Sequence, residues 1–116
     1  MKMIYTAIAI LGMTAILGMY LLSLIIRNKS TPKSASFIHG LFAVIGLVLL
    51  IIYCGGNDPS PIVSIIVFSI AAVGGFIVVY KDVTGSHIPK WLAIVHGVTA
   101  VVGYGFLIAF AFCDNY

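Results

Sequence analysis

Hydrophobic residues occur in four long stretches, and polar and charged residues gather in the short segments between them. Each stretch is close to the ~20 residues that an α-helix needs to cross the hydrocarbon core of a bilayer. The intervening segments are rich in Gly, Pro, Ser and Asn, which favour turns and loops. The pattern predicts an all-α membrane protein with four transmembrane helices, at about residues 4–26, 34–53, 61–80 and 90–112.

Composition supports a membrane location. Of 116 residues, 62% are hydrophobic and 8% are charged. A soluble domain cannot bury that much apolar surface, so we expect the lipid bilayer to be the main solvent. The net charge of +3 comes from few residues near the ends of the stretches. It therefore indicates orientation in the membrane and not nucleic-acid binding. The length allows one domain.

The first stretch resembles a signal peptide in having Lys2 before an apolar run. However, the run is longer than the apolar region of a signal peptide and lacks an Ala-x-Ala cleavage site. It is followed by Arg27 and Lys29, which are typical of a stop-transfer flank. We therefore expect a retained helix.

Basic residues are concentrated in the first and third connecting segments. The positive-inside rule predicts that these segments are cytoplasmic and that both termini lie outside, as in a bacterial inner-membrane protein. Short connections make sequential helices antiparallel neighbours, which predicts an up-down-up-down four-helix bundle. The residues concerned are Arg27, Lys29, Lys33, Lys81 and Lys90.

One sequence pattern occurs twice. Pro-Lys-x5-His-Gly-x2-Ala-Val-x-Gly begins at Pro32 and again at Pro89, 57 residues later. The match predicts a duplicated helical hairpin, with repeats at about residues 4–54 and 61–113. The two hairpins would be related by a pseudo-twofold axis along the membrane normal.

The duplication places His39 and His96 at matched depth on the second and fourth helices, which are diagonal partners in such a bundle. Each histidine is followed on the same helix face by two small residues and a leucine, at i+4, i+7 and i+11. Small residues next to an imidazole leave room for a flat ligand. The two faces comprise His39, Ala43, Gly46 and Leu50, and His96, Ala100, Gly103 and Leu107.

The ligand that this arrangement favours is one haem b per chain, with His39 and His96 as axial ligands of the iron. Diagonal helices are roughly 13 Å apart, a separation that two imidazoles and an iron can bridge. Gly18 and Gly75 fall at similar depth on the other two helices and would let their backbones approach the macrocycle. Lys33 and Lys90 are candidate contacts for the propionates.

Other interpretations of the histidines remain open. Gly and Ala on transmembrane faces often serve helix packing, and two histidines can hydrogen-bond within a bundle without binding a ligand. A metal, quinone or small-solute site is a further alternative. Two histidines supply only half of a tetrahedral zinc shell. His87 lies in a loop, where the other repeat has Ser30, and is interpreted as solvated.

The two cysteines, Cys54 and Cys113, end the second and fourth helices on the same side of the membrane. In an oxidising compartment they are candidates for a disulfide between the two hairpins. Diagonal helices would have to converge for this bond to form. The alternative is two free apolar thiols near the interface.

At its duplicated histidines, the chain resembles the b-type transmembrane four-helix cytochromes of the cytochrome b561-like group. The resemblance implies haem held between facing helices, and electron exchange with a quinone or a redox partner protein by a haem-dependent membrane oxidoreductase. Many such proteins have two haems and four intramembrane histidines, whereas this chain has one matched pair. Haem sensing or delivery is therefore as well supported as electron transfer across the membrane.

Two further classes of function remain. A cofactor-free membrane scaffold or assembly subunit would use its glycine-rich faces for helix association, and a homodimer is one candidate assembly. A small-multidrug-type transporter also has four short helices, but it relies on a membrane-embedded carboxylate. No Asp or Glu lies within a predicted span. The chain has no hydrolytic constellation and no phosphate-binding loop.

Overall fold

The computed structural model describes residues 2–56 and 59–113, which fold into four α-helices without a strand in those ranges. This confirms the predicted all-α class. Each helix is long enough at ~1.5 Å per residue to cross ~30 Å of hydrocarbon. The helices are α1 (Lys2–Ile26), α2 (Lys33–Gly56), α3 (Ile62–Val83) and α4 (Lys90–Cys113).

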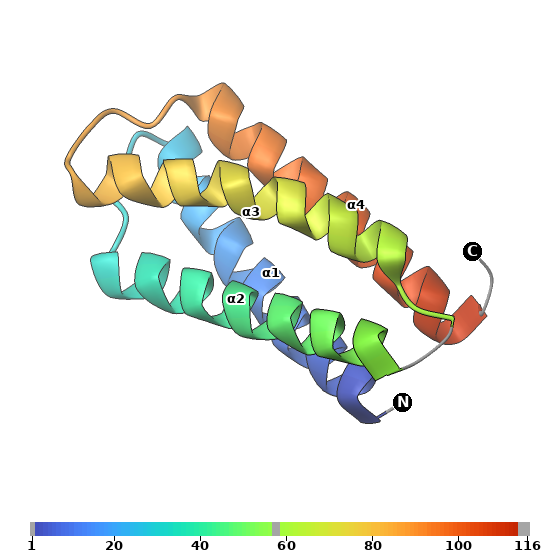
Figure 1. Ribbon diagram of the computed structural model, residues 1–116. Helices are drawn as coiled ribbons and strands as arrows, with labels where there is room; N and C mark the ends of the chain where they lie inside the picture. Colours follow the sequence, from blue (N-terminus) through green and yellow to red (C-terminus); the bar gives the residue numbers. More distant parts are fainter. Residues whose placement is uncertain (1, 57–58, 114–116) are drawn as a thin grey trace.

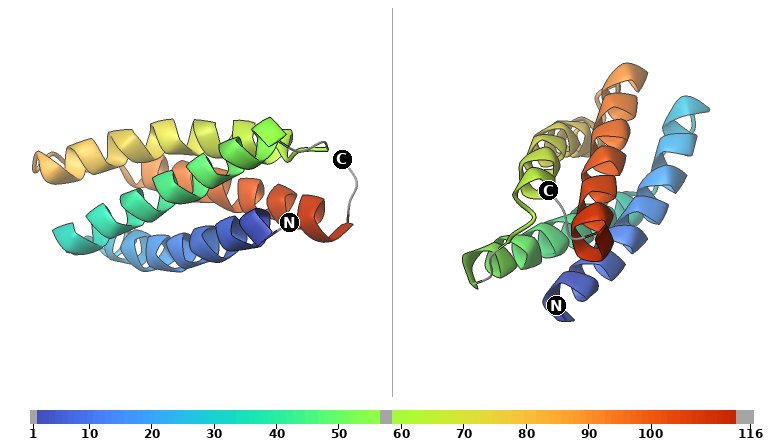
Figure 2. Two further views of the ribbon diagram at one scale, coloured as in Figure 1. Left: turned by 60° about the horizontal axis from the view of Figure 1, so that its bottom comes forward. Right: turned by 90° about the vertical axis from the view of Figure 1, so that its right-hand side faces the viewer.

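The four helices form an antiparallel bundle (Figures 1 and 2). α1 packs against α2 and α4, and α3 packs against the same two helices, so α2 and α4 are diagonal partners. The segments 27–32 and 84–89 connect the helices of each hairpin at one end of the bundle, called the loop end below. The start of α1 and the end of α4 lie at the opposite end.

The helix ends at the loop end are built alike in both hairpins. Asn28 and Gly85 follow α1 and α3 with φ angles of 58° and 77°. In each case the next residue donates its N–H to a carbonyl five residues earlier, which is the Schellman motif that ends many helices. Pro32 and Pro89 then precede α2 and α4, where proline's fixed φ suits the start of a helix.

The outer surface of the bundle is apolar. In the most hydrophobic part of each helix, fewer than a quarter of the residues are buried. Large side chains such as Ile16, Phe37, Phe76 and Val101 are more than 60% exposed. Water would not tolerate so continuous an apolar surface, whereas lipid does. The chain is therefore a small integral membrane protein, and its 43 Å length suits a bilayer with its headgroups.

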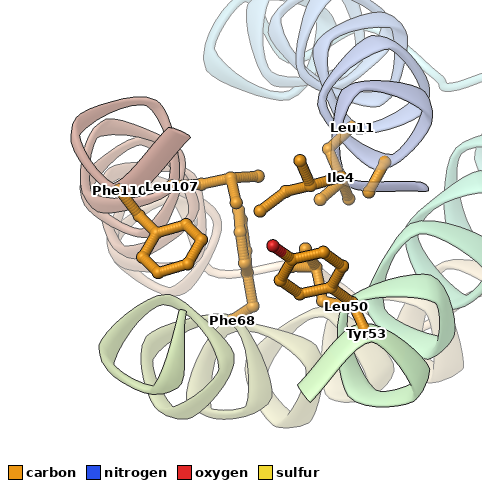
Figure 3. Packing of buried hydrophobic residues seen from close by; sticks show 8 residues of the cluster. Ile4, Leu11, Leu50, Tyr53, Phe68, Leu107 and Phe110 are labelled. Atoms are coloured by element: carbon orange, nitrogen blue, oxygen red, sulfur yellow. The ribbon is translucent and has the colours of Figure 1, made fainter. Parts of the chain in front are cut away.

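The core repeats at the 57-residue interval. Leu50 and Leu107 are fully buried, and Leu11 and Phe68 occupy equivalent places on α1 and α3. Figure 3 shows these side chains converging between the four helices. Tyr53, with Phe110 at the equivalent position, adds an edge-to-face aromatic pair with ring centroids 6.3 Å apart. Both hairpins therefore contribute matched side chains to one shared core.

Candidate functional site

The two histidines of the repeated pattern meet in the centre of the bundle. His39 on α2 and His96 on α4 are half-buried, and their ring centroids lie 6.2 Å apart with an angle of 87° between the planes. These rings come from helices that are diagonal partners. The structure thus brings together the two residues for which the sequence predicts a common ligand.

Each imidazole is held by a backbone carbonyl of its own hairpin. His39 Nδ1 is 3.0 Å from the carbonyl oxygen of Thr14 on α1, and His96 Nδ1 is 2.8 Å from that of Ala71 on α3. A carbonyl oxygen only accepts, so Nδ1 must donate in both rings. In the neutral imidazole Nε2 then carries the lone pair, and it has no hydrogen-bond partner among the described residues.

Gly18 and Gly75 allow these hydrogen bonds to form. A Cβ at Gly18 would lie 2.8 Å from Cε1 of His39, and one at Gly75 would lie 2.7 Å from Cε1 of His96. Any larger residue would push the ring away from the carbonyl that fixes it. In this structure the two glycines, predicted to pack on a macrocycle, pack on the imidazoles themselves.

The small residues beyond the histidines are also in contact with protein side chains. Gly46 is buried against Leu11, where a Cβ would come within 2.5 Å of a leucine methyl carbon, and Gly103 is buried against Phe68. Ala43 and Ala100 are half-buried. The faces predicted to accommodate a flat ligand are therefore occupied by α1 and α3 in this conformation.

The donor set at the histidines is small. No group of three or more His, Cys, Asp or Glu side chains lies close enough to hold a metal ion within residues 2–56 and 59–113. A free zinc ion needs three or four protein ligands. Haem iron receives four nitrogens from its macrocycle and needs only axial ligands from the protein. A pair of imidazoles fits the second requirement and not the first.

A second polar cluster lies at the loop end and centres on Asp82, which is buried in the last turn of α3. Its carboxylate accepts hydrogen bonds from Thr31 Oγ1 at 2.7 Å, Lys33 Nζ at 2.8 Å and Ser36 Oγ at 2.9 Å. Lys33 Nζ also donates to the Asp82 carbonyl at 2.6 Å. These four residues, called the Asp82 cluster below, join α3 to the start of α2.

Sequence reasoning missed this carboxylate because it ended the third span at Tyr80 and treated the following segment as a basic loop. The helix instead continues to Val83, so α3 does contain an acidic residue. Gly85 was the available signal, because a glycine commonly follows the last turn of a helix. All hydrogen bonds to the carboxylate are local ones at the helix end, which differs from a carboxylate in the middle of a transport pathway.

The Asp82 cluster has no polar equivalent in the other half of the molecule. The positions 57 residues away from Asp82, Thr31 and Ser36 hold Ile25, Ile88 and Ala93. Only the lysine is kept, as Lys90, and it makes no ion pair with a described residue. Of the two lysines predicted to contact propionates, Lys33 is therefore already paired and Lys90 is exposed.

Two other predictions concern residues near the bundle ends. Cys54 is half-buried and Cys113 is exposed, and both are free thiols in this structure, so the candidate disulfide is not formed. His87 is exposed in the connection between α3 and α4. It lies apart from the histidine pair, in agreement with its interpretation as a loop residue.

The two best-defined cavities lie away from the histidines. One is an apolar groove of about 340 Å³ between α1 and α2, lined by residues such as Met13, Tyr20 and Phe42. The other is a polar cavity of about 460 Å³ at the loop end, and Asp82 is part of its wall. A macrocycle between His39 and His96 would therefore require the helices to separate at that depth.

Comparisons of the chain with protein-family models, with curated proteins and with solved structures found no match.

Proposed function

We propose that this integral membrane protein binds one haem b through His39 and His96, and that it serves electron transfer or haem handling in the membrane. The observation that carries the proposal is the geometry of the imidazole pair. When a metal ion lies between two imidazole nitrogens, each about 2 Å away, the ring centroids are roughly 6 Å apart. The observed separation is 6.2 Å.

The hydrogen bonds support the same function. Histidines that ligate metals usually donate their other ring N–H to a carbonyl or carboxylate, which fixes the ring and makes it a better ligand. Both Nδ1 atoms are bound in this way by Thr14 and Ala71. The Nε2 atoms are left as the ligating atoms. Haem, when bound, supplies one-electron chemistry, and the chain supplies ligation and an apolar surrounding.

The test is a reduced-minus-oxidised visible spectrum of the purified protein before and after addition of haemin. His39→Asn and His96→Asn are the informative variants, because an asparagine amide can still donate to a backbone carbonyl but is a poor iron ligand. His87→Asn, in the exposed loop, is the matched control. We expect sharp low-spin b-type bands in the wild type and the control, and their loss in either of the other variants.

A wild-type protein that stays colourless after addition of haemin would refute the proposal. A second function would then be favoured by a specific observation, the close fit of each imidazole between a glycine and a carbonyl. In that case the histidines join the helices of each hairpin, and the protein is a cofactor-free membrane scaffold. His39→Ala would then lower thermal stability in detergent by more than His39→Asn, with no change in the spectrum.

A further inference from the structure

The polar cavity at the loop end lies on the relation between the two hairpins. Its twelve lining residues form six pairs whose members are 57 residues apart, and these include Lys29 with Ser86, Ser30 with His87, and Lys33 with Lys90. Equivalent residues of both hairpins can border one cavity only if it lies close to the pseudo-twofold axis. Its volume of about 460 Å³ is within the about 300–1,000 Å³ of small-molecule sites.

The charge of this cavity is strongly unbalanced. Three lysines border it, Lys29, Lys33 and Lys90, against the single carboxylate of Asp82. Both oxygens of that carboxylate already accept hydrogen bonds from the Asp82 cluster. Lys29 and Lys90 make no ion pair or side-chain hydrogen bond with any residue in the described ranges. Two positive charges therefore face the cavity without a protein counter-ion.

Helix ends add to the positive potential. Lys33 and Lys90 are the first residues of α2 and α4, so both helices begin at the cavity wall. The first N–H groups of a helix lack intrahelical acceptors, and the helix dipole favours an anion near them. Ser30, Ser86 and His87 provide further hydrogen-bonding groups at the rim.

The position of the cavity relative to the membrane suggests the kind of anion. Tyr80 and Trp91, near the loop end of α3 and α4, are 64% and 67% exposed. Amphipathic aromatic side chains of this kind are enriched at the headgroup level of a bilayer. The cavity therefore lies where lipid headgroups meet water, which is where clusters of lysines attract anionic phospholipids.

We propose that the loop-end cavity binds a phosphate group at the membrane surface, with Lys29 and Lys90 as its charged contacts. The group belongs either to an anionic phospholipid or to soluble phosphate. The site is independent of the histidine pair and of haem, so His39→Asn and His96→Asn are expected to retain it.

The test titrates the protein in a non-ionic detergent with short-chain phosphatidylglycerol, with inorganic phosphate and with short-chain phosphatidylcholine. Fluorescence of Trp91, the sole tryptophan and the neighbour of Lys90, reports binding. Lys29→Gln and Lys90→Gln each remove one charge at the cavity. Lys2→Gln removes the same charge at the opposite end of the bundle and is the matched control.

We expect saturable binding that weakens about fivefold in each cavity variant and is unchanged in Lys2→Gln. A response to phosphatidylglycerol alone identifies a lipid headgroup as the ligand, and an equal response to inorganic phosphate identifies the free anion. The proposal is overturned if neither ligand gives a saturable response, or if phosphatidylcholine binds as tightly. It is also overturned if Lys2→Gln weakens binding as much as Lys90→Gln, because the effect is then one of overall charge.

Discussion

The two interfaces between the hairpins occupy equivalent places but are closed in different ways. At the α2–α3 interface, polar contacts are concentrated at the loop end, in the Asp82 cluster. At the α1–α4 interface, the equivalent residues are apolar, and the polar contact lies toward the opposite end, where Tyr104 donates to the carbonyl of Ile8 at 2.9 Å. The residues equivalent to Tyr104 and Ile8 at the α2–α3 interface are Leu47 and Ile65.

This difference contrasts with the centre of the bundle, where the halves have stayed alike. The imidazole–carbonyl hydrogen bonds, the glycines under the rings and the buried leucines all recur at the 57-residue interval. A pattern kept in the centre and changed at both ends indicates that the centre carries a requirement common to both hairpins. The ends are free to specialise, and each interface retains one polar attachment.

The largest effect is expected from Asp82→Ala. It removes the carboxylate that three side chains share, and it leaves the hydroxyls of Thr31 and Ser36 without their acceptor. We expect a loss of unfolding free energy toward the lower end of ~3–5 kcal/mol, because Lys33 is 61% exposed and can be rehydrated. Reversible unfolding in mixed detergent micelles measures it. Ile25→Ala at the equivalent position is the matched variant, and equal losses in both would contradict the comparison.

A somewhat smaller effect is expected from Gly18→Ala and Gly75→Ala, and it should be equal in the two variants. Each new methyl group would overlap an imidazole ring, which costs about 1–3 kcal/mol when a packed core must adjust. Gly40→Ala, which has open space around the added carbon, is the control. Unequal losses, measured in the same unfolding assay, would show that the centre is less symmetric than its contacts indicate.

Tyr104→Phe is expected to have a modest effect. It removes one hydroxyl that hydrogen-bonds to the carbonyl of Ile8, and such a bond contributes about 0.5–1.5 kcal/mol. Tyr80→Phe, at an exposed position on α3, is the control and should be neutral. Thermal unfolding followed by circular dichroism would measure both. No difference between them would mean that the α1–α4 interface depends on apolar packing alone.

The smallest effect is expected from Lys33→Gln, at about 1 kcal/mol or less, because exposed ion pairs contribute little and are screened by salt. Lys90→Gln should have no measurable effect on stability, since its carboxylate partner is absent from the described residues. The two unfolding curves should converge as salt is raised. A salt-independent loss in Lys33→Gln would instead assign the effect to its hydrogen bond with the Asp82 carbonyl.

The fold was largely predictable from the sequence because apolar length and turn residues determine it. Four runs of about 20 apolar residues leave few alternatives in a bilayer, and short connections impose antiparallel neighbours. The meeting of His39 and His96 was predictable for a different reason, since a duplicated motif on diagonal helices must place both copies at the same depth.

The immediate surroundings of the histidines were not predictable in the same way. Small residues indicate that space is available, but they do not indicate whether a ligand or a neighbouring side chain fills it. Leu11 and Phe68 fill it here. Asp82 was missed because its partners Thr31, Lys33 and Ser36 are about 50 residues away along the chain, and only the packing of α3 against α2 brings them together.

The unequal Asp82 cluster also affects how hairpins recognise each other during assembly. A first hairpin carries Thr31, Lys33 and Ser36 but no carboxylate, while a second hairpin carries Asp82 but has Ile88 and Ala93 in place of the hydroxyls. Two first hairpins, or two second hairpins, would therefore lack one side of the contact. Only an unlike pair satisfies it. One aspartate thus makes the duplicated halves complementary, and it disfavours mispairing of like hairpins from neighbouring chains while they insert into the membrane.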